Sequence, residues 1–328
     1  MSDEMNVRKP RFSVEMFLRP ELTLIVVIIL IAIATTLVNP NFLFVGNLTD
    51  IARAAVIYFV MACGASLLMI GGGLDFSVGA VFTLGGITTT WLLQLGVPWP
   101  LAIAVGVLIG AMAGFLNSQI IAKLHVPSII ATLGTFYIFT GFTIQVTGGQ
   151  DILPLPKSFQ MLGQGSVFGI PFVVIYAAVV GAIFWFILER TPFGVEVRAV
   201  GGNRDAALAN GIRVARVERI IYVLGGATAA FAGIIYAARV GSGQVAAGGS
   251  AVTLSVITAV LIGGVSLHGG LGSITGIAVG ALLLSEIDNA LIVASVPPQY
   301  NTIIVGVILI AAVAVDHLRR QRLYRSKR

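Results

Sequence analysis

The stretch "LLMIGGGLDFSVGAV", residues 67–81, joins two apolar segments through three consecutive glycines and a single carboxylate, Asp75. A carboxylate is costly inside a lipid bilayer, so its place between two apolar segments needs a physical reason. Glycine lets a chain turn sharply. The stretch therefore predicts two apolar helices that meet at a turn. Asp75 would lie in that turn, near the start of the second helix, where free backbone N–H groups need acceptors.

The whole chain has the composition of a membrane protein. Its 328 residues are 57% hydrophobic and only 10% charged, whereas soluble domains carry about 25% charged residues. Apolar runs long enough to cross a bilayer recur from end to end. Lipid forces backbone polar groups to pair within a segment, which favours helices, and a barrel would show short alternating strands instead. We therefore predict an all-α polytopic membrane protein.

Ten apolar runs define the expected membrane spans. The eighth has only about 13 residues, too few to cross a bilayer alone if it is straight, so it is either broken or extends toward Gly249. The first run is long for a signal-peptide core and lacks a small-residue cleavage site, so we expect it to be retained. The expected spans are 22–38, 51–70, 77–95, 101–122, 128–147, 172–188, 220–240, 253–265, 273–291 and 302–315.

Lysine and arginine residues set the expected orientation. With the N-terminus inside and ten spans, 17 of the 20 Lys and Arg lie on the cytoplasmic side, leaving Arg53, Lys157 and Arg239 outside. Positive residues concentrate in cytoplasmic loops, so ten spans with both ends inside agree with the charges. The basic tails then touch lipid headgroups and do not indicate nucleic-acid binding. The expected parts are a cytoplasmic tail (1–21), one transmembrane domain (22–316) and a basic cytoplasmic tail (317–328).

Residue types that serve catalysis or metal binding are scattered. The single cysteine, Cys63, lies in an apolar run and excludes an internal disulfide, and His125, His268 and His317 are far apart in the chain. We expect neither catalytic residues nor a metal site. The chain also lacks the glycine-rich, lysine-containing loop that binds nucleotide phosphates. Any ATP-driven work therefore needs an ATPase on another chain.

The long cytoplasmic loop 189–219 reads "ERTPFGVEVRAVGGNRDAALANGIRVARVER". Gly201 and Gly202 break the chain, Asn203 is a good N-cap, and Gly211 is a natural helix stop. The residues between them, 204–210, predict about two helical turns. So short a helix cannot bury its own apolar face. We expect it to dock on the rest of the protein or on a partner.

Four blocks of sequence resemble one family. "TPFGVEVRAVGGNRDAALANGI", from Thr191, resembles the coupling segment in permease subunits of ATP-binding-cassette (ABC) importers for simple sugars. This is the ribose-type group that also includes autoinducer-2 permeases. "IGGGLDFSVGAV", "GFLNSQIIAKLHVPSIIATLGT" and "ITAVLIGGVSLHGGLGSITG" resemble three further motifs of that family. The blocks occur in order from about residue 47 to 316, so the resemblance implies an ABC-importer permease fold for the transmembrane domain.

The resemblance also implies a division of work among subunits. Two permease subunits, identical or paralogous, form the pathway, and a cytoplasmic ABC ATPase beneath them binds ATP and Mg. A periplasmic or extracellular substrate-binding protein delivers the solute. This chain would bind no cofactor, would not be an enzyme, and would be a multi-pass protein of the bacterial cytoplasmic (inner) membrane. Its short helix in loop 189–219 would transmit the movement of the ATPase. The coupling residues so implied are Gly202, Asn203, Arg204, Ala206, Ala207, Leu208 and Gly211.

Polar residues within or beside the spans are candidates for the gate or the pathway. Asp75 either caps the third span at a cytoplasmic turn or lines the pathway. Amides in membrane helices bond across helices or line cavities. A neutral sugar suits amides, hydroxyls and aromatic rings better than fixed charges. The candidates are Asp75, Ser77, Asn117, Tyr137 and Asn289.

Several residues depart from the family pattern and leave the solute open. Thr253 stands where an acidic residue is common, and Val195 stands where a basic residue is common. Glu286 and Asp288 add two acids to a span that is usually neutral there, and Arg53 could neutralise one of them. Intramembrane acids keep open a second function, a stand-alone secondary transporter driven by ion gradients. The solute could be a pentose, a hexose, a sugar alcohol or autoinducer-2.

Overall fold

The computed structural model describes residues 20–297 and 299–325, and they are almost entirely helical. Most of the expected tail 1–21 and the last residues of the basic tail lie outside this described part. In chain order the elements are α1 (Pro20–Val38), the 3-10 helix η2 (Pro40–Leu43), α2 (Val45–Ile70), α3 (Val78–Gln94), α4 (Trp99–Leu124), α5 (Ser128–Thr147), α6 (Lys157–Gln164), β1 (Ser166–Val167), β2 (Ile170–Pro171), α7 (Phe172–Arg190), α8 (Pro192–Gly202), α9 (Arg204–Ala209), α10 (Val214–Val240), α11 (Ser250–Ile262), α12 (Ile274–Val293) and α13 (Gln299–Arg325).

The fold class is confirmed: the chain is an all-α polytopic membrane protein. Within the described residues, seven helices are long and apolar enough to cross a membrane, namely α1, α2, α4, α5, α7, α10 and α12. Three shorter apolar segments, α3, α11 and residues 299–314 of α13, accompany them. Each of the ten expected spans overlaps one of these helices. The short eighth span is the 13-residue helix α11, which begins directly after Gly249.

Two loops contain helices that the sequence patterns did not predict. The loop between α5 and α7 holds α6 and the small β1–β2 hairpin, in which Ser166 pairs with Pro171. The loop after α7 holds α8 as well as the expected α9. "TPFG" reads as a turn, but Thr191 is the N-cap of α8 and its side chain accepts a hydrogen bond from the Gly194 N–H, with Pro192 in the first turn. Proline is favoured there because that N–H needs no helical partner.

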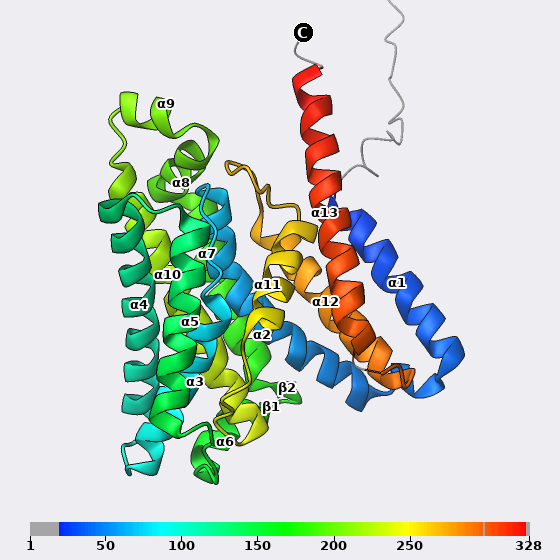
Figure 1. Cartoon of the computed structure of the whole chain (residues 1–328). Helices are drawn as coiled ribbons and strands as arrows, with labels where there is room; N and C mark the ends of the chain where they lie inside the picture. Colours follow the sequence, from blue (N-terminus) through cyan, green and yellow to red (C-terminus); the bar gives the residue numbers. More distant parts are fainter. Residues whose placement is uncertain (1–19, 298, 326–328) are drawn as a thin grey trace, which may run out of the picture.

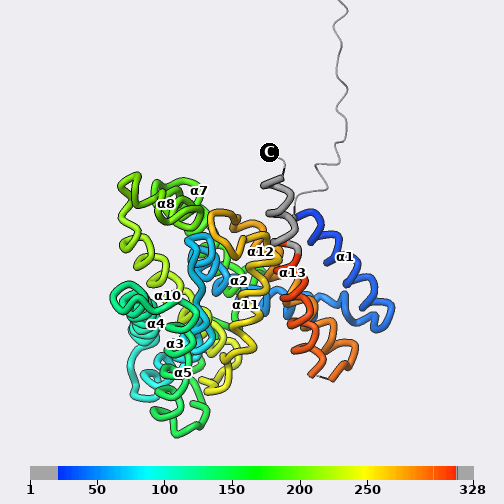
Figure 2. Tube along the Cα trace, turned by 45° about the horizontal axis from the view of Figure 1, so that its top comes forward, coloured from blue at the N-terminus to red at the C-terminus, as the bar shows by residue number. Residues whose placement is uncertain are grey.

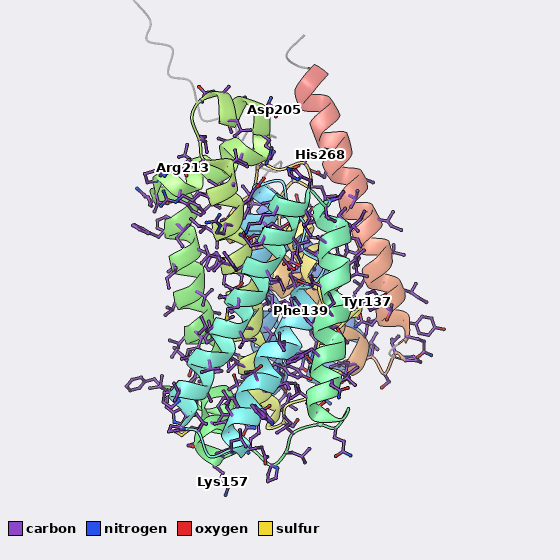
Figure 3. All side chains as sticks on the ribbon, turned by 60° about the vertical axis from the view of Figure 1, so that its left-hand side comes forward. Tyr137, Phe139, Lys157, Asp205, Arg213 and His268 are labelled. Carbon is purple, nitrogen blue, oxygen red and sulfur yellow. The ribbon has the colours of Figure 1, made fainter. Side chains whose placement is uncertain are left out.

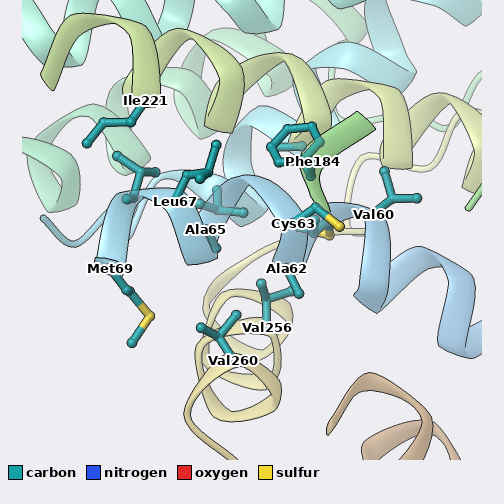
Figure 4. Close-up of a cluster of buried hydrophobic side chains, with 14 of the residues drawn as sticks. Val60, Ala62, Cys63, Ala65, Leu67, Met69, Phe184, Ile221, Val256 and Val260 are labelled. Carbon is teal, nitrogen blue, oxygen red and sulfur yellow. The ribbon is translucent and has the colours of Figure 1, made fainter. Parts of the chain in front are cut away.

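Helix α10 lies at the centre of the bundle, packed against α4, α3 and α2. Glycines allow this close approach. A Cβ added to Gly114 of α4 would lie 2.0 Å from the Tyr222 carbonyl oxygen of α10, and one added to Gly226 would lie 2.1 Å from the Gly110 oxygen. Small residues at such contacts are the usual means by which membrane helices associate. The buried apolar face of α2 continues this core through Phe184 of α7 and Val256 of α11 (Figure 4).

Different elements lie at the two ends of the helix bundle (Figure 1). α8 and α9 lie at one end, and α6 with the β1–β2 hairpin lies at the other. α1 begins and α13 ends at the α8–α9 end. Figure 2 shows α1 and α13 on the flank opposite α3, α4 and α5. The described ends of the chain therefore share one face with the loop expected to dock a partner.

Candidate functional site

Asp75, Ser77 and Asn117 meet in one buried hydrogen-bonded cluster at the start of α3. One Asp75 carboxylate oxygen accepts hydrogen bonds from the Ser77 backbone N–H (2.7 Å) and the Ser77 hydroxyl (2.6 Å). The Asn117 amide of α4 donates to the Ser77 hydroxyl (2.8 Å) and more weakly to the other Asp75 oxygen (3.4 Å). Ser77 is the N-cap of α3, yet its side chain makes no cap hydrogen bond. Burial raises the pKa of the Asp75 carboxyl, and the bonds from Ser77 and Asn117 oppose that shift.

The two short helices α3 and α11 begin side by side in the interior. The Gly79 N–H of α3 donates to the Thr253 hydroxyl of α11 (3.1 Å), and the Gly248 N–H donates to the Thr83 hydroxyl of α3 (2.9 Å). A Cβ on Gly79 would lie 2.3 Å from the Gly249 oxygen, so this crossing requires glycine. Discontinuous helices whose ends meet within a bundle are a recurring feature of transport proteins. The neutral Thr253, in the first turn of α11, thus links the start of α11 to the start of α3 through its hydroxyl group.

Two glycine-rich turns lie against each other at the α8–α9 end. The first, residues 71–77, follows α2, and the second, residues 263–273, follows α11. The Gly270 N–H of the second turn donates to the Ile70 carbonyl at the end of α2 (2.8 Å). Gly72, Gly269 and Gly270 have φ between 80° and 82°, a left-handed conformation that favours glycine. The two turns are therefore in direct backbone contact.

The last turn of α8 contacts both glycine-rich turns. A Cβ on Gly201 would lie 1.8 Å from the Ile70 oxygen and 2.9 Å from the Gly270 nitrogen, so the backbones touch at this point. The Arg198 guanidinium of α8 donates to the Gly272 carbonyl (3.1 Å) and forms an ion pair with Glu189 of α7. Sequence patterns identified Gly201 only as a chain break. No sequence signal reveals its packing role, because the residues that it contacts are far away in the chain.

Helix α9 is held at both ends and exposes most of its surface. The Asn203 side chain accepts a hydrogen bond from the Ala206 N–H (2.9 Å), and Gly211 ends the turn with a φ of 80°. Arg204 forms an ion pair with Glu218 at the start of α10 (3.1 Å). Ala207 is buried, while Leu208 is 49% exposed. Figure 3 shows Asp205 of α9 at the same end as Arg213 and His268, opposite Lys157 of α6. The implied coupling residues thus form one projecting hairpin.

The remaining pathway candidates lie away from the Asp75 cluster. Asn289 of α12 exchanges two side-chain hydrogen bonds of 2.9 Å with Asn47 of α2. Tyr137 is 72% exposed on the outer surface of α5 (Figure 3). Arg53 does not neutralise the acids of α12, because its ion pair is with Asp50 (3.8 Å) one turn earlier on the same helix. The structure thus joins three of the five candidates and separates the other two.

A second polar cluster includes residues that the sequence patterns did not bring together. The Tyr58 hydroxyl of α2 donates to one Asp288 carboxylate oxygen (2.8 Å). Ser255 of α11 lies beside Tyr58, and Asn301 of α13 lies beside Asp288. Polar residues on four apolar helices are the only signal in the sequence, and it does not reveal which of them meet. In the described part of the chain, no three His, Cys, Asp or Glu residues are grouped as a metal site would require.

Comparisons with known proteins relate the chain to import permeases. The family described as the permease component of a branched-chain amino acid transport system matches residues 47–313. A ribose import permease protein of Bacillus subtilis is 38% identical over 301 residues, which cover 91% of this chain and 92% of that protein. An autoinducer 2 import system permease protein of Escherichia coli O9:H4 is 32% identical over 310 residues, covering 94% and 90% of the two chains. No solved structure matches the chain.

Proposed function

Because the chain belongs to the family of branched-chain amino acid transport system permease components, we propose that it is the membrane-spanning subunit of an ABC importer for a simple sugar or sugar-like solute. The family description names amino acids, whereas the named relatives are permeases for ribose and autoinducer 2. Identity of up to 38% over nine tenths of the chain favours the sugar-like solute. None of these relatives supports a stand-alone secondary transporter, so that alternative is set aside.

The observation that carries the proposal is the contact of α8 with both glycine-rich turns. A cytoplasmic ATPase that pushes on the exposed face of α9 would move α8 with it, because Asn203 caps α9 directly after α8 ends. Gly201 and Arg198 would carry this displacement into the turns at residues 71–77 and 263–273. These turns adjoin α2, α3, α11 and α12, so one movement could reorient four helices. Such rigid-body gating is a common way to couple a distant site to a pathway.

The other subunits follow from the same proposal. The pathway forms between two permease copies, either identical or paralogous, in the bacterial cytoplasmic membrane. ATP and Mg bind to the ATPase, and a secreted binding protein supplies the solute at the end that carries α6. Residues 22–316 form the permease domain, residues 189–219 form its coupling loop, and residues 1–21 and 317–328 are its cytoplasmic tails. Asp75, Ser77 and Asn117 belong to the gate.

The test is purification of the tagged chain from its host, followed by reconstitution of the co-purified subunits in proteoliposomes. We expect an ATPase to co-purify and ATP to drive uptake of at least one of ribose, xylose, galactose, a sugar alcohol or autoinducer 2. Leucine is the comparison solute. ATP-driven uptake of leucine alone would contradict the sugar assignment. Uptake by the chain alone, driven by a proton or sodium gradient without ATP, would contradict the importer assignment as a whole.

A further inference from the structure

The cluster of Tyr58, Ser255, Asp288 and Asn301 has buried acceptors that the protein leaves unused. Atom Oδ1 of Asp288 and atom Oδ1 of Asn301 are both buried and have no hydrogen-bond partner. Buried polar atoms are nearly always paired. Leaving an oxygen of a charged carboxylate unpaired costs more free energy than leaving a neutral acceptor unpaired. The charges of the described residues do not compensate, because none of their ion pairs includes Asp288. These two Oδ1 acceptors therefore have no donor among the described residues.

The cluster is nevertheless reachable from one side. Tyr58, Asp288 and Asn301 are each partly exposed, while Ser255 is buried beside them. Tyr58 lies near the middle of α2 (Val45–Ile70), about three turns from either end of that helix. At this depth, ionisable side chains face the interior of a bundle or a water-filled cavity and not lipid. Within the proposed function, we place this partly exposed side toward the solute pathway.

The neighbouring acid on α12, Glu286, differs from Asp288 in its exposure and in the helices that it faces. Glu286 also has an unpaired carboxylate oxygen, but its side chain is only 4% exposed. The i, i+4 spacing places Glu286 on the same helix face as Ala290, which packs with Phe42 beside Ile31 of α1. Glu286 thus faces the α1 side, and Asp288 faces α2 and α13. Glu286 is therefore a matched control for substitutions of Asp288.

On the basis of the proposed function, we propose that Asp288, Asn301 and Tyr58 form a subsite that accepts hydrogen bonds from adjacent hydroxyl groups of the sugar during import. A sugar diol offers two donors at close spacing, which match two unpaired acceptors on neighbouring side chains. The Tyr58 hydroxyl holds the other Asp288 oxygen at 2.8 Å and so orients the carboxylate. A hydroxyl-lacking analogue would leave the acceptors unpaired and would be rejected.

The transport test compares Asp288→Asn with Glu286→Gln in the complete transporter in proteoliposomes, with radiolabelled D-ribose as the probe. We expect Asp288→Asn to raise the KM for import by about tenfold or more, since bonds to a charged acceptor are lost. Tyr58→Phe should raise it by a smaller factor, and Glu286→Gln should leave it unchanged. Equal KM values for Asp288→Asn and the wild type would overturn the subsite. Loss of the two-copy assembly in Asp288→Asn would also overturn it, because the cluster would then be a subunit contact.

A labelling test does not depend on which sugar is imported. Ser255→Cys, 8% exposed beside the partly exposed Tyr58, should react with a small, charged thiol reagent added in water, whereas the native Cys63, 0% exposed, should not. Reaction at Ser255→Cys no faster than at Cys63 would mean that the cluster is sealed, and the subsite would be wrong. Absence of ribose import by the wild-type transporter, with normal labelling of Ser255→Cys, would count instead against ribose as the solute. The two failures are therefore distinguishable.

Discussion

At the scale of single residues, Asp75 is buried at the start of α3, and the chain supplies hydrogen-bond donors to both of its carboxylate oxygens. Ser77 provides two hydrogen bonds to one carboxylate oxygen, and Asn117 reaches the other. The carboxylate thus replaces water at the start of α3 and ties that start to α4. This geometry supports the proposed role of Asp75 as a fixed part of the gate and not as a direct contact with the solute.

The Asp75→Asn variant tests the demand for an acceptor at this position. An amide NH2 group would replace the oxygen that faces the Asn117 amide, so two donors would oppose each other. We expect a loss of about 1–3 kcal/mol in stability, as for other buried unpaired groups, together with slower import. Thermal unfolding in detergent and ATP-driven uptake measure the two effects. Asp50→Asn is the control, because its exposed ion pair of 3.8 Å contributes little, and an equal loss in both variants would refute the role of Asp75.

The absence of a side chain at Gly201 allows α8 to touch both glycine-rich turns, the contact through which we propose that coupling passes. In Gly201→Ala the new Cβ would collide with the Ile70 oxygen, and backbone cannot move aside as a flexible side chain can. We expect about 1–3 kcal/mol of destabilisation and import reduced more strongly than ATP hydrolysis. Gly141→Ala on α5, where nothing lies within 4 Å of the new atom, should be neutral. Wild-type coupling in Gly201→Ala would show that the contact with the turns is dispensable.

At the scale of elements, the α8–α9 hairpin separates a structural face from a free face. Ala207 is buried against the protein, and Leu208 is 49% exposed beside it. Substitution of Ala207 would disturb the hairpin itself. Leu208 is therefore the better probe of a partner surface.

We expect Leu208→Glu to insert and fold normally but to lose association with the ATPase, because a carboxylate would replace an apolar contact that is buried on docking. The matched control is Met161→Glu, an exposed apolar residue of α6 at the opposite end. Quantitative co-purification with the ATPase should fall about tenfold or more in Leu208→Glu and stay unchanged in Met161→Glu. Equal recovery of the ATPase with both variants would reject α9 as the docking element.

At the scale of the whole molecule, the bundle has two chemically different ends. The α8–α9 end carries Arg198 of α8, Arg204 of α9 and Arg213, together with the described ends of the chain. The other end carries α6 and Lys157 (Figure 3). The concentration of basic residues at the first end agrees with its expected cytoplasmic location. The orientation therefore has a direct test.

Single cysteines at the two ends should differ in access. In intact cells, Lys157→Cys should react with a membrane-impermeant thiol reagent, and Asp205→Cys should react only after the cells are broken. Both positions lie at exposed ends of the bundle in Figure 3, so folding should not limit the reaction. The reverse pattern would invert the orientation, and reaction of both in intact cells would contradict placement at opposite ends.

The sequence by itself determined the class of fold, the family and the location of the α9 hairpin. Composition and the length of apolar runs decide these features, because lipid imposes helices of nearly constant length. Local signals determine the hairpin as well, because Asn203 caps the start of α9 and Gly211 allows the chain to turn after its end. For the same reason, α8 was missed: its cap at Thr191 uses residues that also form turns.

Only the tertiary structure decided which distant residues meet. Asp75 with Asn117, Gly201 with Ile70, and Tyr58 with Asp288 are each pairs separated by dozens of residues or more. The contacts depend on how helices cross, and in lipid that is set by the close packing of small residues. This chain has 39 glycines, so many crossings were compatible with its sequence. The stretch at residues 67–81 predicted the turn, but packing against α4, α8 and α11 decided which residues it contacts.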